Sequence, residues 1–140
     1  MNLVWPSREY LPGYLEALQK GWSPDNVRGK AAADEQLAMI ASDSNAFLAG
    51  LIDREAKGKP IDLPDGRIPG FTRWLWDAEF CGSIGFRRQP GTEALPPHCL
   101  GHIGYAVVPW KQGRGYATLA LRQLLPEAAA EGLRYRIALT

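Results

Sequence analysis

The strongest pattern of hydrophobic and polar positions lies in the last third of the chain. An apolar, strand-like run extends from Ile103 to Val108 and stops at Pro109. After a short basic loop, apolar residues recur at the spacing of one helix face, at Ala117, Ala120, Leu121, Leu124, Leu125 and Ala128. The pattern therefore predicts a strand, a loop and an amphipathic helix, in that order.

The first half of the chain predicts a short strand followed by two or three helices. The strand covers residues 3–5 and stops at Pro6. Helical spacing then recurs in three sets: Leu11, Tyr14, Leu15 and Leu18; Leu37, Ile40 and Ala41; and Phe47, Leu48, Leu51 and Ile52. Pro12 suits the first turn of the first helix, Gly21 is placed to end it, and Asp43 or Ser44 is placed to cap the third.

The middle of the chain predicts a β-hairpin between two loops. Residues 71–77 alternate between two faces, and residues 80–86 form a second strand behind a tight connection. One face of the first strand carries Phe71, Arg73, Leu75 and Asp77, and the other carries Thr72, Trp74 and Trp76. Proline and glycine mark residues 57–70 as a loop, and prolines mark residues 89–100 as another.

One residue conflicts with the predicted final helix. Pro126 lies inside the apolar pattern, where a proline removes a backbone hydrogen bond and clashes with the preceding turn. The cost in a regular helix interior is about 3 kcal/mol. A kink or a break is therefore expected between residues 122 and 125.

The loop before this helix has the composition of a phosphate-binding turn. Gly113 and Gly115 let a ligand come close to the backbone. Backbone N–H groups at a helix start have no intrahelical partner, and the helix dipole is positive there, so such a turn holds a pyrophosphate without a metal. The alternative is an ordinary strand-to-helix turn that uses glycine for its shape. The sequence lacks Gly-x-x-x-x-Gly-Lys-Ser/Thr, and it lacks Gly-x-Gly-x-x-Gly with an acidic residue downstream.

The residues from Gln112 to Ala117 also fit the pattern Gln/Arg-x-x-Gly-x-Gly/Ala, and they resemble the acetyl-CoA loop of the GNAT superfamily of N-acetyltransferases. The likeness extends back over residues 102–109, similar to that family's fourth strand, and forward over residues 132–140, similar to its fifth. The resemblance implies an α/β (α+β) fold with a mixed, mostly antiparallel central sheet flanked by helices, truncated after the fifth strand. It also implies acetyl transfer from acetyl-CoA to an amine of a small molecule or peptide, with no covalent acyl-enzyme.

By this resemblance, the acetyl-CoA site has a loop part and a strand part. The backbone N–H groups expected to hold the pyrophosphate are those of Gln112, Gly113, Arg114, Gly115, Tyr116 and Ala117. The backbone of Ala106, Val107 and Val108 is expected to bind the pantetheine arm, much as a strand adds to a sheet edge. The charges of Lys111 and Arg114 either assist the phosphates or are solvated on the loop.

A catalytic base is needed because the amine arrives as an ammonium ion. His102 is the candidate, near the start of the strand where many family members place a glutamate; the alternative is a strand-end histidine with no catalytic role. Glu79 is a weaker candidate base. Tyr105 is expected to pack in the core, and Trp22, Trp74 and Trp76 either pack in the core or line an acceptor pocket.

Composition excludes several other classes of function. The 140 residues suit a single domain over residues 1–140, and 16 basic residues nearly cancel 15 acidic ones, which argues against a nucleic-acid partner. No apolar run approaches the roughly 20 residues that span a bilayer, and the N-terminal residues do not form a secretion signal. A cytoplasmic protein without a membrane partner is therefore expected. Cys81 and Cys99 are expected to be free thiols, and no metal site is expected, although His98 precedes Cys99.

The end of the sequence supports an alternative to catalysis. The GNAT family continues beyond its fifth strand with a helix and two more strands, whereas this sequence stops at Thr140. A non-catalytic CoA-binding or interaction module is therefore the alternative function. The strand expected at residues 135–140 would lie at a bare sheet edge, which predicts a homodimer or higher oligomer.

Overall fold

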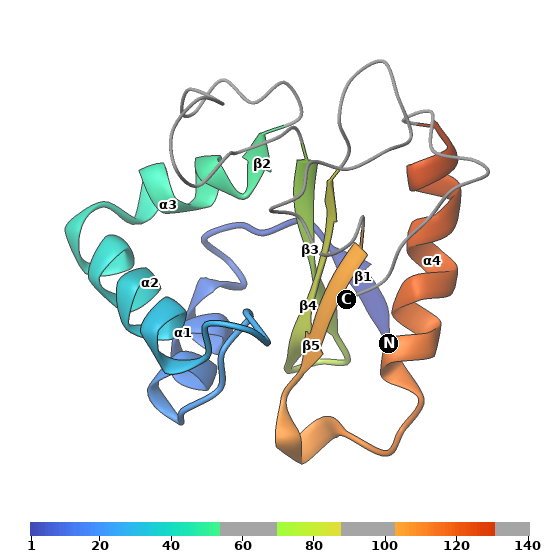
Figure 1. Ribbon diagram of the computed structural model, residues 1–140, viewed down its shortest axis with the longest axis horizontal. Coiled ribbons are helices and arrows are strands. Elements are labelled where there is room, and N and C mark those ends of the chain that lie inside the picture. Colours follow the sequence, from blue (N-terminus) through green and yellow to red (C-terminus); the bar gives the residue numbers. More distant parts are fainter. Residues whose placement is uncertain (54–69, 88–102, 131–140) are drawn as a thin grey trace.

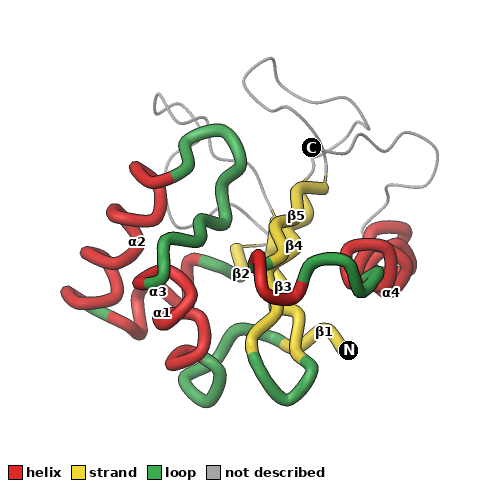
Figure 2. Tube along the Cα trace, turned by 90° about the horizontal axis from the view of Figure 1, so that it is seen from below, coloured by secondary structure: helices red, strands yellow, loops and turns green. Residues whose placement is uncertain are grey.

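An antiparallel sheet lies at the centre of the fold and separates two layers of helices (Figure 1). The computed structural model describes residues 1–53, 70–87 and 103–130. Within this part of the chain, α1 (Leu11–Gln19), α2 (Lys30–Ser42) and α3 (Ser44–Gly50) cover one face of the sheet, and α4 (Tyr116–Ala130) covers the other. Figure 2 shows the sheet edge-on between the two layers.

The sheet confirms the mostly antiparallel arrangement expected from the sequence. Its strands are β1 (Asn2–Val4), β2 (Ile52–Asp53), β3 (Gly70–Trp76), β4 (Phe80–Arg87) and β5 (Ile103–Val107). The order is β1-β3-β4-β5, all pairs are antiparallel, and β2 continues the same edge of β3 that β1 begins. The predicted hairpin is therefore β3–β4, at the centre of the sheet.

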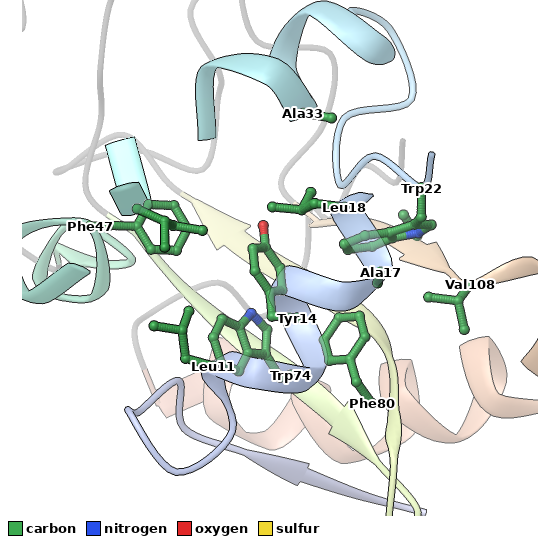
Figure 3. Packing of buried hydrophobic residues seen from close by; sticks show 12 residues of the cluster. Leu11, Tyr14, Ala17, Leu18, Trp22, Ala33, Phe47, Trp74, Phe80 and Val108 are labelled. Carbon is green, nitrogen blue, oxygen red and sulfur yellow. The ribbon is translucent and has the colours of Figure 1, made fainter. Parts of the chain in front are cut away.

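The layer of α1, α2 and α3 packs on the sheet through aromatic side chains gathered around Tyr14 (Figure 3). The Tyr14 ring stacks on Trp74 with 4.6 Å between ring centroids, and its edge meets Phe80 and Trp22. Its hydroxyl donates a hydrogen bond to the side-chain oxygen of Gln36, and burial raises the Tyr14 pKa. Trp22 and Trp74 are both buried, so of their two expected roles the structure shows core packing.

The second hydrophobic core lies between α4 and the opposite face of the sheet. Ala120, Leu124 and Ala128 are fully buried there at helical spacing. Phe71 and Leu75 face this core while Trp74 faces the other, so the predicted alternation of β3 is confirmed. Leu125 was expected on the buried face, but it is 38% exposed, because the apolar stripe of α4 is narrower than the sequence pattern.

The expected break in the final helix is absent. Helix α4 continues from Tyr116 to Ala130 through Pro126. Pro126 and Arg122 are both exposed, so the carbonyl that loses its N–H partner to the proline ring can hydrogen-bond to water instead. The expectation of a break was wrong because a proline on the solvent side of a helix leaves no buried polar group unsatisfied. The other expected outcome, a kink between residues 122 and 125, stays a prediction.

The helix boundaries in the first half follow the predicted signals. Pro12 lies in the first turn of α1, and Asp43 caps α3 by accepting a hydrogen bond from the Ala46 N–H at 3.1 Å. Ile52, expected on the third helix, belongs to β2 instead. The two predicted loops, residues 57–70 and 89–100, lie almost entirely outside the described residues, and so does the strand expected at residues 135–140.

Candidate cofactor site

The glycine-containing loop lies where the sequence analysis expected it, between β5 and α4. A single 3-10 turn (Pro109–Lys111) follows β5, and residues 112–115 then lead directly into the first residue of α4. Gly113 and Gly115 have φ angles of +81° and +75°, a region that other residues rarely adopt. A Cβ at either glycine would have no described atom within 4 Å, so no described residue fills the space beside the loop backbone.

The first turn of α4 contains N–H groups without an intrahelical partner next to this loop. The Leu119 N–H donates to the Gly115 carbonyl at 3.1 Å, so the helical hydrogen-bond ladder begins at Gly115. The N–H groups of residues 116–118 come before the first such bond and have no intrahelical partner. Together with the positive end of the helix dipole, they form a site suited to an anion.

A largely buried carboxylate at the tip of the β3–β4 hairpin, that of Asp77, contacts residues at both ends of the loop. Both oxygens of Asp77 lie 3.1 Å from Lys111 Nζ, and the Tyr116 hydroxyl donates to Oδ2 at 2.7 Å. Lys111 Nζ also lies 2.9 Å from Glu79 Oε1, and Arg114 Nη1 lies 3.8 Å from Asp77 Oδ2. Three residues in or beside the loop therefore converge on Asp77.

These contacts correct the expectation for Lys111. It was expected to assist the phosphates or to be solvated, but it is only 7% exposed and is paired with Asp77 and Glu79. A charge buried to this extent needs a partner, and the Asp77 carboxylate provides one. The Arg114 side chain is 52% exposed, so it can still turn toward a ligand.

The pKa values of the cluster agree with a permanent ion pair at neutral pH. Burial alone would raise the pKa of Asp77, but hydrogen bonds from Tyr116 and Lys111 outweigh it and lower the pKa to about 2. Hydrogen bonds to Glu79 and Asp77 raise the pKa of Lys111. Burial, with the neighbouring Asp77 charge, raises the pKa of the Cys81 thiol to about 12, so this free thiol is protonated and unreactive.

The strand part of the expected site shows which backbone groups point away from the sheet. The Val108 N–H donates to the Cys81 carbonyl at 2.9 Å, so Val108 and Ala106, two residues apart, direct their backbone groups toward β4. The backbone N–H and C=O groups of Tyr105 and Val107 point to the opposite side of β5, away from β4. Of the three residues expected to bind the pantetheine arm, Val107 is therefore the one whose backbone faces away from β4.

Side-chain amides hydrogen-bond to these outward carbonyls. Asn26 Nδ2 donates to the Tyr105 carbonyl at 2.9 Å, and Gln112 Nε2 donates to the Val107 carbonyl at 3.2 Å. Both carbonyls thus accept a hydrogen bond from an amide N–H on the side of β5 that faces away from β4. Nothing in the sequence pattern predicted the contact of Asn26, which lies 79 positions before its partner.

Three further candidate residues from the sequence have different outcomes. His102 lies outside the described residues, so its role stays a prediction. Glu79 has a side chain that is 75% exposed and is paired with Lys111. Tyr105 packs against the core beneath α4, as expected.

Asp77 is a site residue that the sequence analysis did not identify as one. The alternation of residues 71–77 placed two charged residues, Arg73 and Asp77, among the apolar residues that face α4. Charges on a buried face require partners, and this was the available signal. Arg73 finds its partner in Glu127 of α4, and Asp77 finds its partners in Lys111 and Tyr116.

The described residues contain neither a membrane-spanning helix nor a metal cluster. Over residues 1–53, 70–87 and 103–130, no helix is both long and apolar enough to cross a membrane. The same residues contain no group of three or more histidine, cysteine, aspartate or glutamate side chains placed to hold a metal ion.

Comparison with known proteins gave one solved structure and one family. The chain is similar to the microcin C7 self-immunity acetyltransferase MccE, whose crystal structure is in complex with acetyl-CoA and AMP, with 15% identity and a TM-score of 0.49 over 94% of this chain and 63% of that one. This chain thus spans less than two thirds of the length of MccE. Comparison with curated protein sequences found no match.

The family comparison covers more than half of the chain. The model of the acetyltransferase (GNAT) family matches residues 37–140, which include β3, β4, β5, the glycine-containing loop and α4. The chain therefore belongs to the GNAT acetyltransferase family.

Proposed function

We propose that this protein binds acetyl-CoA at the loop of residues 112–117 and transfers the acetyl group to an amine nitrogen of a small molecule or peptide. One observation carries the proposal: Gly113 and Gly115 adopt left-handed conformations and face open space at the start of α4. This loop lies inside the part of the chain that matches the GNAT family.

In this proposal, the pyrophosphate binds mainly to backbone groups. The missing side chains at Gly113 and Gly115 allow phosphate oxygens to reach the N–H groups of the loop and of the first turn of α4. Arg114 is exposed enough to add a positive charge, whereas Lys111 is held by Asp77 and Glu79. Affinity for the phosphates therefore depends more on the shape of the loop than on its side-chain charges.

The pantetheine arm is proposed to lie along the outward edge of β5. This arm contains two amide N–H groups, and the carbonyls of Tyr105 and Val107 already accept hydrogen bonds from amide groups. Ligand amides would replace Asn26 and Gln112 at these positions, as a strand adds to a sheet edge. The exchange conserves the number of hydrogen bonds, so it costs little.

The chemistry proposed is direct attack on the thioester. The amine nitrogen, once deprotonated, bonds to the carbonyl carbon of the acetyl group, and the carbon–sulfur bond then breaks to release CoA thiolate. The nitrogen loses its second proton as the amide forms, and the thiolate takes up that proton. His102 is proposed to accept the proton of the incoming ammonium, directly or through water.

Calorimetry with CoA, followed by acetyl-transfer assays on a panel of amines, tests this function. The proposal expects CoA binding and turnover with at least one class of amine, and it expects His102→Ala to lower kcat while the affinity for CoA stays within about twofold. Absence of CoA binding by the wild-type chain would refute the proposal. CoA binding without turnover of any amine would instead support a non-catalytic CoA-binding module.

A further inference from the structure

We propose that Asp77 is the positioning residue of the pyrophosphate loop, acting through Lys111 and Tyr116 rather than by touching the ligand. This inference rests on the proposed function. Lys111 comes directly before the four loop residues, and Tyr116 comes directly after them. Both side chains bind the same carboxylate. Asp77 therefore holds the two ends of the loop, residues 112–115, at a set distance from each other.

The carboxylate is itself held firmly in place. It belongs to a tight turn in which the Asp77 N–H donates to the Glu79 carbonyl at 3.0 Å and the Glu79 N–H donates back to Asp77 Oδ1 at 3.3 Å. Ala78 between them has a φ angle of +84°, which persists only where the surroundings impose it. The turn joins β3 and β4, the two central strands, so the anchor belongs to the most extensively paired part of the sheet.

The loop needs such an anchor because of its glycines. Gly113 and Gly115 give the backbone access to a phosphate, but they also give the free loop many alternative conformations. Donors that hold an anion must stay within about 0.5 Å of their working positions. Fixing both ends of a four-residue loop on one carboxylate limits this freedom without placing a side chain in the anion site.

Substituting Asp77 is expected to change the affinity for CoA in two opposite ways. Removing the carboxylate would free Arg114 and leave Lys111 paired with Glu79 alone, which favours binding of an anion, but it would also release the loop. A substitution at Tyr116 separates the two effects. Tyr116→Phe removes one hydrogen bond to Asp77 and changes no charge at neutral pH.

The test measures the affinity for CoA by calorimetry in Tyr116→Phe, Asp77→Asn and the double variant. Tyr116→Phe is expected to weaken binding about threefold to tenfold, the value of one hydrogen bond, and Asp77→Asn by about tenfold or more. If the hydroxyl acts through the side chain of residue 77, Tyr116→Phe has a smaller effect in the Asp77→Asn background, where the neutral amide oxygen accepts a weaker hydrogen bond than the carboxylate does. Merely structural damage would instead add in the double variant.

Glu127→Gln is the matched control. It also removes a carboxylate charge from a pair that fastens α4 to the sheet, the one with Arg73, but at the far end of the helix. We expect this variant to lower the melting temperature and leave the affinity for CoA unchanged. If Asp77→Asn does not fold, Tyr116→Phe against Glu127→Gln decides the question.

The outcomes separate this inference from the proposed function. A wild-type chain that does not bind CoA overturns the proposed function, and the inference falls with it. A wild-type chain that binds CoA with the same affinity as Tyr116→Phe and Asp77→Asn overturns the positioning role alone. Tighter binding by Asp77→Asn would also overturn it, since the charge of Asp77 would then outweigh its hold on the loop.

Discussion

Among single residues, Gly115 has the most direct influence on the proposed anion site. Its φ angle of +75° is unfavourable for a residue with a side chain, and its carbonyl begins the hydrogen-bond ladder of α4. The position where its Cβ would lie is open. A side chain at this position would therefore point into the space that the proposal gives to the pyrophosphate.

Gly115→Asp and Gly115→Asn are predicted to differ in their affinity for CoA although they differ little in shape. Asparagine tolerates a positive φ angle and adds bulk without charge, whereas aspartate adds a negative charge beside the pyrophosphate. We expect Gly115→Asp to bind CoA at least about tenfold more weakly than Gly115→Asn, by calorimetry at equal ionic strength. Equal affinities of the two variants would mean that no anion binds at this position.

The ion pair of Asp77 predicts how stability depends on pH. Its pKa falls from 3.8 to about 2 on folding, so its contribution is fully present above pH 4 and is lost as the pH falls toward 2. The free energy of unfolding, measured with urea, should therefore differ most between wild type and Asp77→Asn above pH 4. The difference should shrink toward pH 2, and a difference that stays constant from pH 5 to pH 2 would contradict the lowered pKa.

At the scale of secondary structure, α4 shows how a local sequence rule can yield to its surroundings. Pro126 weakens the helix without ending it, because the affected turn faces solvent. Gln123 and Glu127 fasten this part of the helix to the sheet, through Leu3 and Arg73 respectively. The helix is therefore maintained by tertiary contacts at positions where its own hydrogen bonding is incomplete.

Pro126→Ala is predicted to raise the stability of the protein. A helix-interior proline costs about 3 kcal/mol, and its restriction of the unfolded chain returns about 1 kcal/mol at most, so a gain of about 2 kcal/mol is expected. Pro12→Ala is the matched control, because Pro12 occupies the first turn of α1, where the ring is tolerated. Thermal unfolding should show a higher melting temperature for Pro126→Ala than for wild type, and no increase for Pro12→Ala.

Much of the fold could be predicted at this scale because each element carries its own period. The alternation of residues 71–77 predicted which side chains face α4, and Asp43 predicted the start of α3. The pairing of Lys111 with Asp77 could not be predicted in this way. A lysine in a loop is expected to be solvated unless the fold places a carboxylate next to it. Periodicity predicts which face of an element a residue lies on, but it does not predict which residue it pairs with.

The same limit applies to the candidate site. The spacing of Gly113 and Gly115 between a strand and a helix was sufficient to find the loop, because the reason for a glycine there is local. Asn26 contacts β5 from a distant part of the sequence, and no local rule points to it. His102 stays a prediction, as do the homo-oligomer, the cytoplasmic location and the amine acceptor.

On the scale of the whole molecule, the sheet brings the parts of the proposed site to one end. The tip of the β3–β4 hairpin, the end of β5 and the start of α4 meet at the loop, although Asp77 and Tyr116 are 39 positions apart in sequence (Figure 1). Both cores contribute to this arrangement. Val108 is buried in the core between α1 and the sheet, and Ala120 in the core between α4 and the sheet, so the loop connects the two cores.

The proposed function makes its most direct claim about backbone N–H groups, and a nitrogen-15 NMR titration with CoA observes those groups individually. The largest changes in amide chemical shift are predicted at Gly113, Gly115, Tyr116 and Ala117, saturating with the affinity found by calorimetry. CoA binding with unchanged signals at these four amides, or with the largest changes elsewhere in the described chain, would contradict the proposed site.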